Sequence, residues 1–163
     1  MHKINTQLKI ISPTADDAGI RKVAESLPRP LVFTNGCFDI LHRGHTTYLE
    51  QARNLGAALI VGVNTDASVK RQNKGDDRPI NNLEDRMALL ASLECVDAVV
   101  SFDQDTPYEL IKLVQPEHLV KGGDWQPKDI VGGDIVQAAG GQVHSIAFQF
   151  DRSTTSLLNK IRG

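Results

Sequence analysis

Two histidines three residues apart, His42 and His45, stand at the end of the stretch TNGCFDILHRGH. A β-rich run precedes them and a helical pattern follows, so both fall on one side of a helix's opening turn. Gly44 between them lets a ligand approach the backbone, where unpaired N–H groups and the helix dipole favour anions. Imidazole donates hydrogen bonds to phosphoryl oxygens when neutral and also carries charge near pH 7. The spacing therefore indicates a phosphate site.

The elements that must position these histidines are apolar runs alternating with helical patterns. Continuous apolar runs predict buried parallel strands at 31–34, 58–63, 98–102, 118–120 and 142–148. Helices are predicted after Gly44, after the cap Asn82, from a capping box at Thr106 with Pro107 first, over 129–139, and after Ser153 or Thr154. The alternation predicts an α/β fold: a Rossmann-like, doubly wound parallel five-stranded sheet with helices on both faces. Ligands are expected at the carboxyl ends of its strands.

Length and composition favour a single domain in a cytoplasmic protein. The 163 residues, 40% of them hydrophobic, allow one core, predicted over 30–163. Residues 1–29 are predicted to form an N-terminal arm followed by an amphipathic helix at 18–27. Lys+Arg 18 against Asp+Glu 20 removes the electrostatic argument for a nucleic-acid or membrane partner. Cys37 and Cys95 are interpreted as reduced core thiols, and no signal peptide or membrane-spanning run is apparent. The charged stretch 70–79 is predicted to be an exposed loop.

Five segments together carry a resemblance to a known family: TNGCFDILHRGHTTYLEQARNLG, VGVNTDASVKR, RPINNLEDRMALL, LVKGGDW and STTSLLNKI. They resemble the nucleotidyltransferase superfamily with an HxGH motif. Within it they are most similar to the adenylyltransferases that convert heptose 1-phosphate to ADP-heptose for lipopolysaccharide. The resemblance covers about 31–161, most of the chain.

The resemblance implies a reaction that matches the residues. An anionic oxygen of the sugar phosphate attacks the α-phosphorus of ATP and expels pyrophosphate, so no general base or covalent nucleophile is needed. Charge cancellation and positioning then supply the catalysis. His42, His45 and Lys70 are the predicted catalytic residues. Mg²⁺ is expected to arrive bound with ATP, with no metal site of the protein's own.

The remaining site residues follow from the same resemblance. Substrate binding is assigned to Asp39, Arg71 and Arg78, with Lys74 and Arg86 as further candidates and Trp125 as a flank or lid. The alternative role of Asp39 is to hold the turn before the histidines, and that of Arg86 is to anchor an ion pair. The family's second motif is an ST-rich turn that binds phosphates, and which of Arg152 and Lys160 assists it stays open. Nucleotide binding is assigned to Asn35, Gly36, Cys37, Phe38, Gly44, Lys121, Gly122, Asp124, Ser153, Thr154 and Thr155.

Several alternatives stay open from the sequence. A cytidylyltransferase acting on glycerol 3-phosphate or a similar small phosphate shares the HxGH and STT motifs. A nucleotide-binding module without turnover, or a zinc site using both histidines and Cys37, would belong to other classes. The partners expected are ATP and a sugar 1-phosphate, and family members suggest a homo-oligomer, as a dimer. His2, His118 and His144 are isolated and are given no role.

Overall fold

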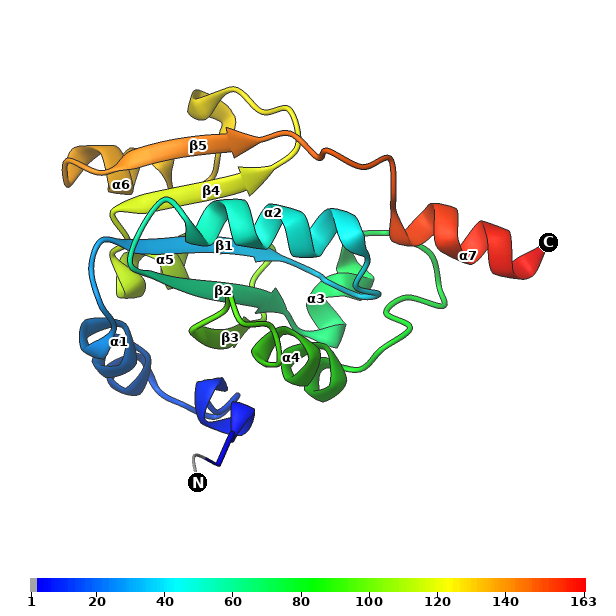
Figure 1. The fold of residues 1–163 in the computed structure, drawn as a ribbon, viewed down its shortest axis with the longest axis horizontal. Coiled ribbons are helices and arrows are strands. Elements are labelled where there is room, and N and C mark those ends of the chain that lie inside the picture. The colour runs from blue at the N-terminus through cyan, green and yellow to red at the C-terminus, as the bar shows by residue number, and fades with distance from the viewer. Residues whose placement is uncertain (1–2) are drawn as a thin grey trace.

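The strands form one parallel sheet with β1 in its centre. The computed structural model describes residues 3–163. His2, to which the sequence assigned no role, lies outside these residues. Within residues 3–163, five strands run parallel in the order β3-β2-β1-β4-β5. Figure 1 shows their carboxyl ends at one edge. The strands are β1 (Leu31–Gly36), β2 (Ala58–Asn64), β3 (Ala98–Phe102), β4 (His118–Gly122) and β5 (Gln142–Ile146). The predicted five-stranded Rossmann-like sheet is confirmed.

Helices cover both faces of the sheet because successive strand residues point to opposite sides. On one face, Phe33 and Ile60 pack into a core with α1 (Asp17–Ser26), α5 (Tyr108–Val114) and α6 (Gly133–Ala138). On the other face, Val32 and Val61 pack into a second core with α2 (Arg43–Arg53) and α4 (Leu83–Ala91). The strands therefore appear in the sequence as unbroken apolar runs.

Local capping explains where most helices begin. The Asn82 side chain accepts the Asp85 amide at the start of α4, and Ser153 forms a capping box with Ser156 at the start of α7 (Thr154–Arg162). The capping box predicted at Thr106 is wrong, because Pro107 is the N-cap residue of α5 and makes no side-chain cap bond. The helix predicted over 129–139 is split into a 3₁₀ turn, η2 (Pro127–Asp129), and α6.

The charged stretch 70–79 differs from the predicted exposed loop at both ends. Its first two residues close α3 (Asp66–Arg71), which Thr65 caps by accepting the Ser68 amide. Arg78 near its far end is 6% exposed. Hydropathy favoured a loop because α3 is short and its buried side chains, Ser68 and Val69, give no apolar period.

The remaining described elements lie at the two ends of the chain. A 3₁₀ turn, η1 (Thr6–Lys9), precedes α1, which begins at Asp17 and ends at Ser26, close to the predicted helix 18–27. Figure 1 shows α7 extending beyond the carboxyl edge of the sheet.

His118 on β4 and His144 on β5, interpreted as isolated from the sequence, are hydrogen-bonded to each other. His118 Nδ1 lies 3.0 Å from His144 Nε2.

The order of the strands creates a crevice beside β1. From β1 the chain crosses through α2 on one face to β2, and β4 on the other side of β1 is reached through α5 on the opposite face. The loop after β1 turns toward one face of the sheet and the loop after β4 turns toward the other, so a crevice opens between them at the carboxyl ends of the two strands. Ligands bind at this place in such sheets. The histidine-containing turn after β1 borders this crevice.

Candidate active site

His42 and His45 lie at the start of α2, immediately beyond β1. His42 is the N-cap residue, with φ −141°, and its side chain makes no cap bond. The two rings stack with centroids 3.8 Å apart and an interplanar angle of 26°. Among the residues that the structure describes, the Nδ1 atoms of both rings are buried without a hydrogen-bond partner. Because leaving such atoms unpaired costs free energy, this pair marks a place for a ligand.

Both imidazoles are held in the neutral form. Burial first, and the neighbouring His42 second, lower the pKa of His45 to about 4. Burial, followed by the positive charge of Arg152, lowers the pKa of His42 as well. A neutral imidazole offers one N–H donor and one acceptor nitrogen. The pair therefore presents hydrogen-bond donors to an anion without carrying a full charge of its own at pH 7.

The turn before the histidines shapes the pair. Phe38 adopts the left-handed region with φ 48°, and its ring meets that of His45 edge-on at a centroid distance of 5.3 Å. A Cβ on Gly36 would lie 3.0 Å from the Phe38 ring, and one on Gly44 would lie 3.0 Å from the His42 ring. Gly44 was expected to admit a ligand to the backbone. Instead, the space beside it is taken by the His42 imidazole.

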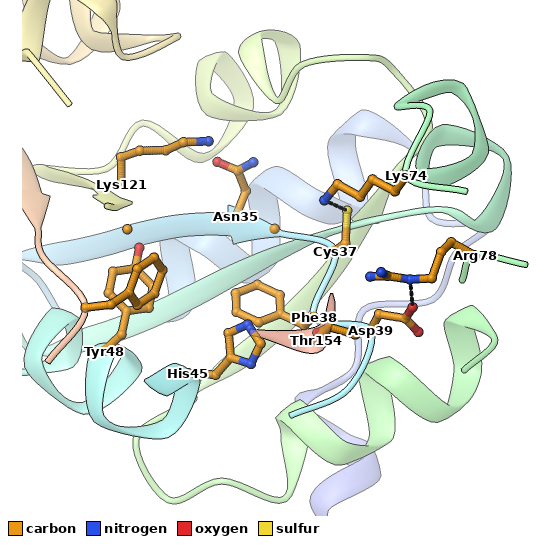
Figure 2. Close-up of a pocket in the computed structure, with 13 residues that line it drawn as sticks. Asn35, Cys37, Phe38, Asp39, His45, Tyr48, Lys74, Arg78, Lys121 and Thr154 are labelled. Carbon is orange, nitrogen blue, oxygen red and sulfur yellow. Dashed lines mark hydrogen bonds and ion pairs between the residues drawn. The ribbon is translucent and has the colours of Figure 1, made fainter. Parts of the chain in front are cut away.

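Asp39 fixes the loop that faces the turn. It is 2% exposed, and its carboxylate accepts hydrogen bonds from the Ile80 and Asn81 amides and from Arg78 Nε at 2.5 Å. Burial alone would raise the pKa of Asp39, but the two amides and then Arg78 outweigh it and lower the pKa. The predicted substrate residues Asp39 and Arg78 thus neutralise each other (Figure 2), which favours the alternative prediction that Asp39 holds the turn.

Arg86 ties three segments together beneath the site. It is fully buried, and its guanidinium donates to the Cys37 carbonyl at 2.7 Å, to Asp66 Oδ1 at 2.7 Å and to the Asn81 carbonyl at 3.0 Å. The ion pair that the sequence offered as one role for Arg86 is therefore present. The arginine joins the ends of β1 and β2 to the loop held by Asp39.

The lysines of the loop after β2 are not equivalent. Lys70, the predicted catalytic lysine, is exposed at the end of α3, whereas Lys74 reaches Cys37, its Nζ 3.3 Å from the thiol sulfur. Lys121 on β4 is half-buried, and burial, followed by the charge of Lys74, lowers its pKa. In Figure 2 the Asn35 side chain lies between the ends of Lys121 and Lys74. Lys74 and Lys121, but not Lys70, line one cavity together with His45.

A cavity of about 160 Å³ gathers most of the predicted residues, and we call it the histidine cavity. Sequence reasoning missed Tyr48 and Phe148, whose rings lie 5.7 Å apart, because both look like ordinary core aromatics. Predicted residues outside its lining are His42, Gly44, Lys70, Arg71, Asp124, Ser153 and Thr155. Predicted residues that line it are Asn35, Gly36, Cys37, Phe38, Asp39, His45, Arg78, Lys121, Gly122 and Thr154, joined by Lys74.

The ST-rich turn meets the cavity through one residue. Thr154 lines it and donates from Oγ1 to the Ile40 carbonyl at 3.5 Å, whereas the Ser153 hydroxyl accepts the Ser156 amide as a cap. Arg152 is exposed, but its charge acts on His42, while Lys160 lies in the last turn of α7. Of the two cations left open by the sequence, Arg152 is the one beside the histidines.

Metal ligands are sparse in this region. Within residues 3–163, no three His, Cys, Asp or Glu side chains are grouped so as to hold a metal ion. The Cys37 sulfur, the third zinc ligand considered above, contacts Lys74 and Gln72 instead. Over the same described residues, no helix has the length and apolar character to cross a membrane.

A parallel sheet with paired histidines at the first strand's carboxyl end defines a nucleotide-transferring class of protein. The chain belongs to the cytidylyltransferase-like family, whose model matches residues 33–152. A curated relative from Bordetella bronchiseptica, a D-beta-D-heptose 1-phosphate adenylyltransferase, is 60% identical over 85% of this chain and 86% of its own length. The resemblance inferred from the five sequence segments is thereby confirmed.

Other relatives are longer proteins. The bifunctional protein HldE of Nitratiruptor sp. is 60% identical over 81% of this chain, and that of Wolinella succinogenes is 49% identical over 99%. The matched region spans only 28% and 33% of those two proteins. These homologues share this chain's domain and carry further sequence besides it.

Solved structures agree on the fold. The lipopolysaccharide core biosynthesis protein of Thermoplasma volcanium superposes with a TM-score of 0.58 at 28% identity, covering 74% of this chain and 98% of that one. Pantoate-beta-alanine ligase from Francisella tularensis superposes with a TM-score of 0.55 over 90% of this chain and 68% of its own. At 14% identity the second match concerns the fold alone.

Proposed function

We propose that this chain transfers AMP from ATP to D-glycero-D-manno-heptose 1-phosphate, giving ADP-heptose and pyrophosphate. The observation that carries nucleotidyl transfer is the stacked, neutral histidine pair with unpartnered Nδ1 atoms beside a lysine-lined cavity. The name of the Bordetella relative supports the choice of ATP and of the heptose phosphate. ADP-heptose would serve lipopolysaccharide or related glycan synthesis, and we place the reaction in the cytoplasm.

The chemistry requires no base from the protein. A phosphate monoester is largely dianionic at pH 7, because its second pKa is about 6. One of its oxygens forms a bond to the α-phosphorus of ATP while the bond from that phosphorus to the α,β-bridging oxygen breaks. The bridging oxygen keeps the electron pair and leaves with pyrophosphate. The protein's task is to align the two phosphates and to stabilise the charge that moves onto the leaving group.

Each residue has a role in this scheme. His42 and His45 donate hydrogen bonds to the triphosphate at the α2 N-terminus, where the helix dipole adds to their effect. Lys74 and Lys121 bring positive charge to the oxygens around the reacting phosphorus. Lys121 fits this task because burial has already lowered its pKa, so an incoming phosphate relieves an unfavourable environment. Lys70, at the end of α3, would act only if its loop closed over the nucleotide.

The apolar part of the histidine cavity suits the base and ribose. Tyr48 is nearly fully buried, with its hydroxyl 3.3 Å from the Val120 carbonyl, and Phe148 lies beside it. A Cβ on Gly122 would lie 2.8 Å from the Phe148 ring, so a larger residue here would displace that ring. These aromatic rings, tilted by 55° to each other beside backbone groups of β4, support base recognition by apolar and main-chain contacts.

Mg²⁺ is proposed to enter with ATP rather than to occupy a protein cage. The buried carboxylate nearest the turn, Asp39, is already bound by Arg78 and two amides, and the described residues group no three metal-binding side chains. Mg²⁺ commonly keeps water and phosphate oxygens as its main ligands. When bound, the ion supplies charge neutralisation on the phosphates.

Pyrophosphate release tests the proposal directly. ATP and CTP are each supplied with Mg²⁺ and either heptose 1-phosphate or glycerol 3-phosphate. Release only with ATP and heptose 1-phosphate is the expected result. Release with CTP and glycerol 3-phosphate would move the chain to the cytidylyltransferase reaction. Nucleotide binding without release under any pair would make it a binding module.

A further inference from the structure

A second cavity adjoins the histidine cavity across Asn35 and Lys121. Both side chains line both cavities, and the second, of about 150 Å³, opens toward the start of α5 and the loop after β4. We call it the tryptophan cavity, after Trp125 in its wall. Of the residues of this cavity, the sequence assigned only Asn35 and Lys121 to a ligand, both to the nucleotide, and named Trp125 as a flank or lid. Two ligands lying one in each cavity would meet at Lys121.

The lining of the tryptophan cavity matches a polyhydroxylated ring. Its polar members are neutral amides, a hydroxyl and carboxylates, and its apolar wall includes Trp125, which is 46% exposed. Carboxylates and amides accept hydrogen bonds from hydroxyl groups, and the indole face packs against C–H bonds. Pockets with apolar walls and a few convergent polar groups fix the orientation of a small ligand. The polar members besides the shared pair are Asn64, Gln72, Asp105, Thr106 and Asp129.

The two cavities differ in charge, and each suits a different part of a sugar phosphate. Asp105 and Asp129 would repel a phosphate, whereas Lys121 and Lys74 of the histidine cavity would attract it. Lys121 lies at the boundary, so a sugar 1-phosphate fits with its ring among the carboxylates and its phosphate at Lys121. In this orientation the phosphate of the sugar lies on the side of the nucleotide in the histidine cavity.

Asp105 is held in position from outside the cavity. Arg71 Nε donates to Asp105 Oδ1 at 2.9 Å, and the same guanidinium lies 3.8 Å from Asp103 Oδ2. Asp103 does not line the tryptophan cavity. Arg71, predicted to bind substrate, is therefore better described as a positioning residue that orients Asp105. The neighbouring Asp103 offers a matched control.

We propose that the tryptophan cavity binds the sugar ring of the acceptor, with Asp105 accepting hydrogen bonds from ring hydroxyls and Trp125 packing against one face. This assignment rests on the proposed adenylyl transfer for its choice of acceptor. It makes Asp105 and Trp125 determinants of sugar specificity rather than of nucleotide binding.

The kinetic test compares Asp105→Ala with Asp103→Ala. Both changes remove an acidic neighbour of Arg71, but only the first removes a cavity group. Losing a hydrogen bond to a charged acceptor costs about tenfold or more in binding. We expect the KM for heptose 1-phosphate to rise at least about tenfold in Asp105→Ala and Trp125→Ala, with the KM for ATP within about twofold of wild type. Asp103→Ala should match wild type in both constants.

Two kinetic outcomes would overturn the assignment. An unchanged KM for heptose 1-phosphate in Asp105→Ala and Trp125→Ala would show that the sugar does not bind in this cavity. A KM for ATP that rises as much as the KM for heptose 1-phosphate would show that the nucleotide binds there instead.

Calorimetric titration separates this inference from the proposed function. Heptose 1-phosphate is titrated with and without Mg²⁺ and an ATP analogue that has a methylene group as its α,β bridge. The Kd should rise about tenfold in Asp105→Ala and stay unchanged in Asp103→Ala. Wild-type binding with this pattern but no pyrophosphate release from ATP would support the sugar site while refuting the reaction. Absence of wild-type binding in both conditions would refute the sugar site.

Discussion

At the scale of single residues, the histidine pair acts through neutrality. Two stacked imidazoles 3.8 Å apart would repel each other if both were protonated. Burial also disfavours the charged form and lowers the pKa of His45 to about 4. Neutral donors do not bind the ground-state triphosphate as tightly as cations would. Their hydrogen bonds strengthen as charge moves onto the leaving pyrophosphate, so their effect is greatest in the transition state.

Removing either imidazole should therefore slow the chemical step. For His42→Ala and for His45→Ala we expect kcat to fall about 100–1000-fold, the usual cost of losing one donor to a developing oxyanion. The measurement is steady-state pyrophosphate release at saturating ATP. His118→Ala is the matched control, because His118 lies on β4 outside both cavities. A loss smaller than tenfold in both variants would assign the pair a structural role.

The depressed pKa of His45 also makes stability depend on pH. The unfolded histidine takes up a proton as the pH falls through 6.5, whereas the folded one stays neutral down to about 4. The unfolded state thus binds more protons in this window, and the free energy of unfolding falls by at most about 1.4 kcal/mol per pH unit. Urea unfolding at pH 7 and pH 5 should show a smaller difference for His45→Gln than for wild type. Equal differences would contradict the low pKa.

Lys74 and Lys70 provide a test of which lysine meets the phosphates. Lys74 lines the histidine cavity and contacts the Cys37 thiol, whereas Lys70 is exposed at the end of α3. We expect Lys74→Ala to lower kcat/KM for ATP at least about tenfold, because it removes a charge beside a phosphate, and Lys70→Ala to lower it less than threefold. The reverse order would show that Lys70, rather than Lys74, meets the phosphates.

At the scale of elements, Arg86 holds the carboxyl ends of two strands in register with the loop over them. The Arg86 side chain has no exposure to solvent and makes three hydrogen bonds, although Asp66, its ion-pair partner, is 40% exposed. Removing the guanidinium leaves the Cys37 and Asn81 carbonyls and Asp66 without this partner. Hydrogen bonds to a charged group contribute about 1.5–3 kcal/mol each, which makes a total loss of about 3–5 kcal/mol reasonable. We expect Arg86→Met to lose about this much by urea unfolding. Arg53→Met, which breaks a pair with Asp97 that is 31% exposed on each side, should lose clearly less.

The sheet was predictable because each strand is buried on both faces and appears as a continuous apolar run. β2, for example, is buried at every position from Ala58 to Asn64. Caps such as Asn82 and Ser153 were predictable because their bonds are local. The short helix α3 was missed because its six residues supply no apolar period, and Asp66 and Arg71 in it are held by distant partners.

The parts of the site whose residues are adjacent in the sequence could be predicted. The contacts between residues far apart in the sequence could not. The turn from Asn35 to Asp39 could be assigned to the cavity because it leads from a strand into the histidine motif. The pairing of Asp39 with Arg78 spans 39 positions, and nothing local in the charged stretch indicates that Arg78 is buried. Tyr48 and Phe148 carried no signal that separates a ligand slot from a core.

At the scale of the whole molecule, two cavities share one edge of the sheet and two side chains. Asn35 is the last residue but one of β1, and Lys121 is the last but one of β4. The connections change face between these two neighbouring strands. A reaction between two phosphates needs both substrates to converge on one point from different directions. The strand order supplies that point, and the loops on either side supply separate pockets for the nucleotide and the acceptor.

The projecting helix α7 predicts that the molecule is a dimer. Figure 1 shows α7 beyond the sheet edge, and Ile161 on it is 76% exposed, following the half-buried Leu157 and Leu158. An apolar helix face left in water is stabilised by a second copy that covers it. We expect sedimentation to give a dimer for wild type and a monomer for Ile161→Glu. Asn159→Glu, the same charge on a polar position of α7, should remain dimeric, and a monomeric wild type would refute the assignment.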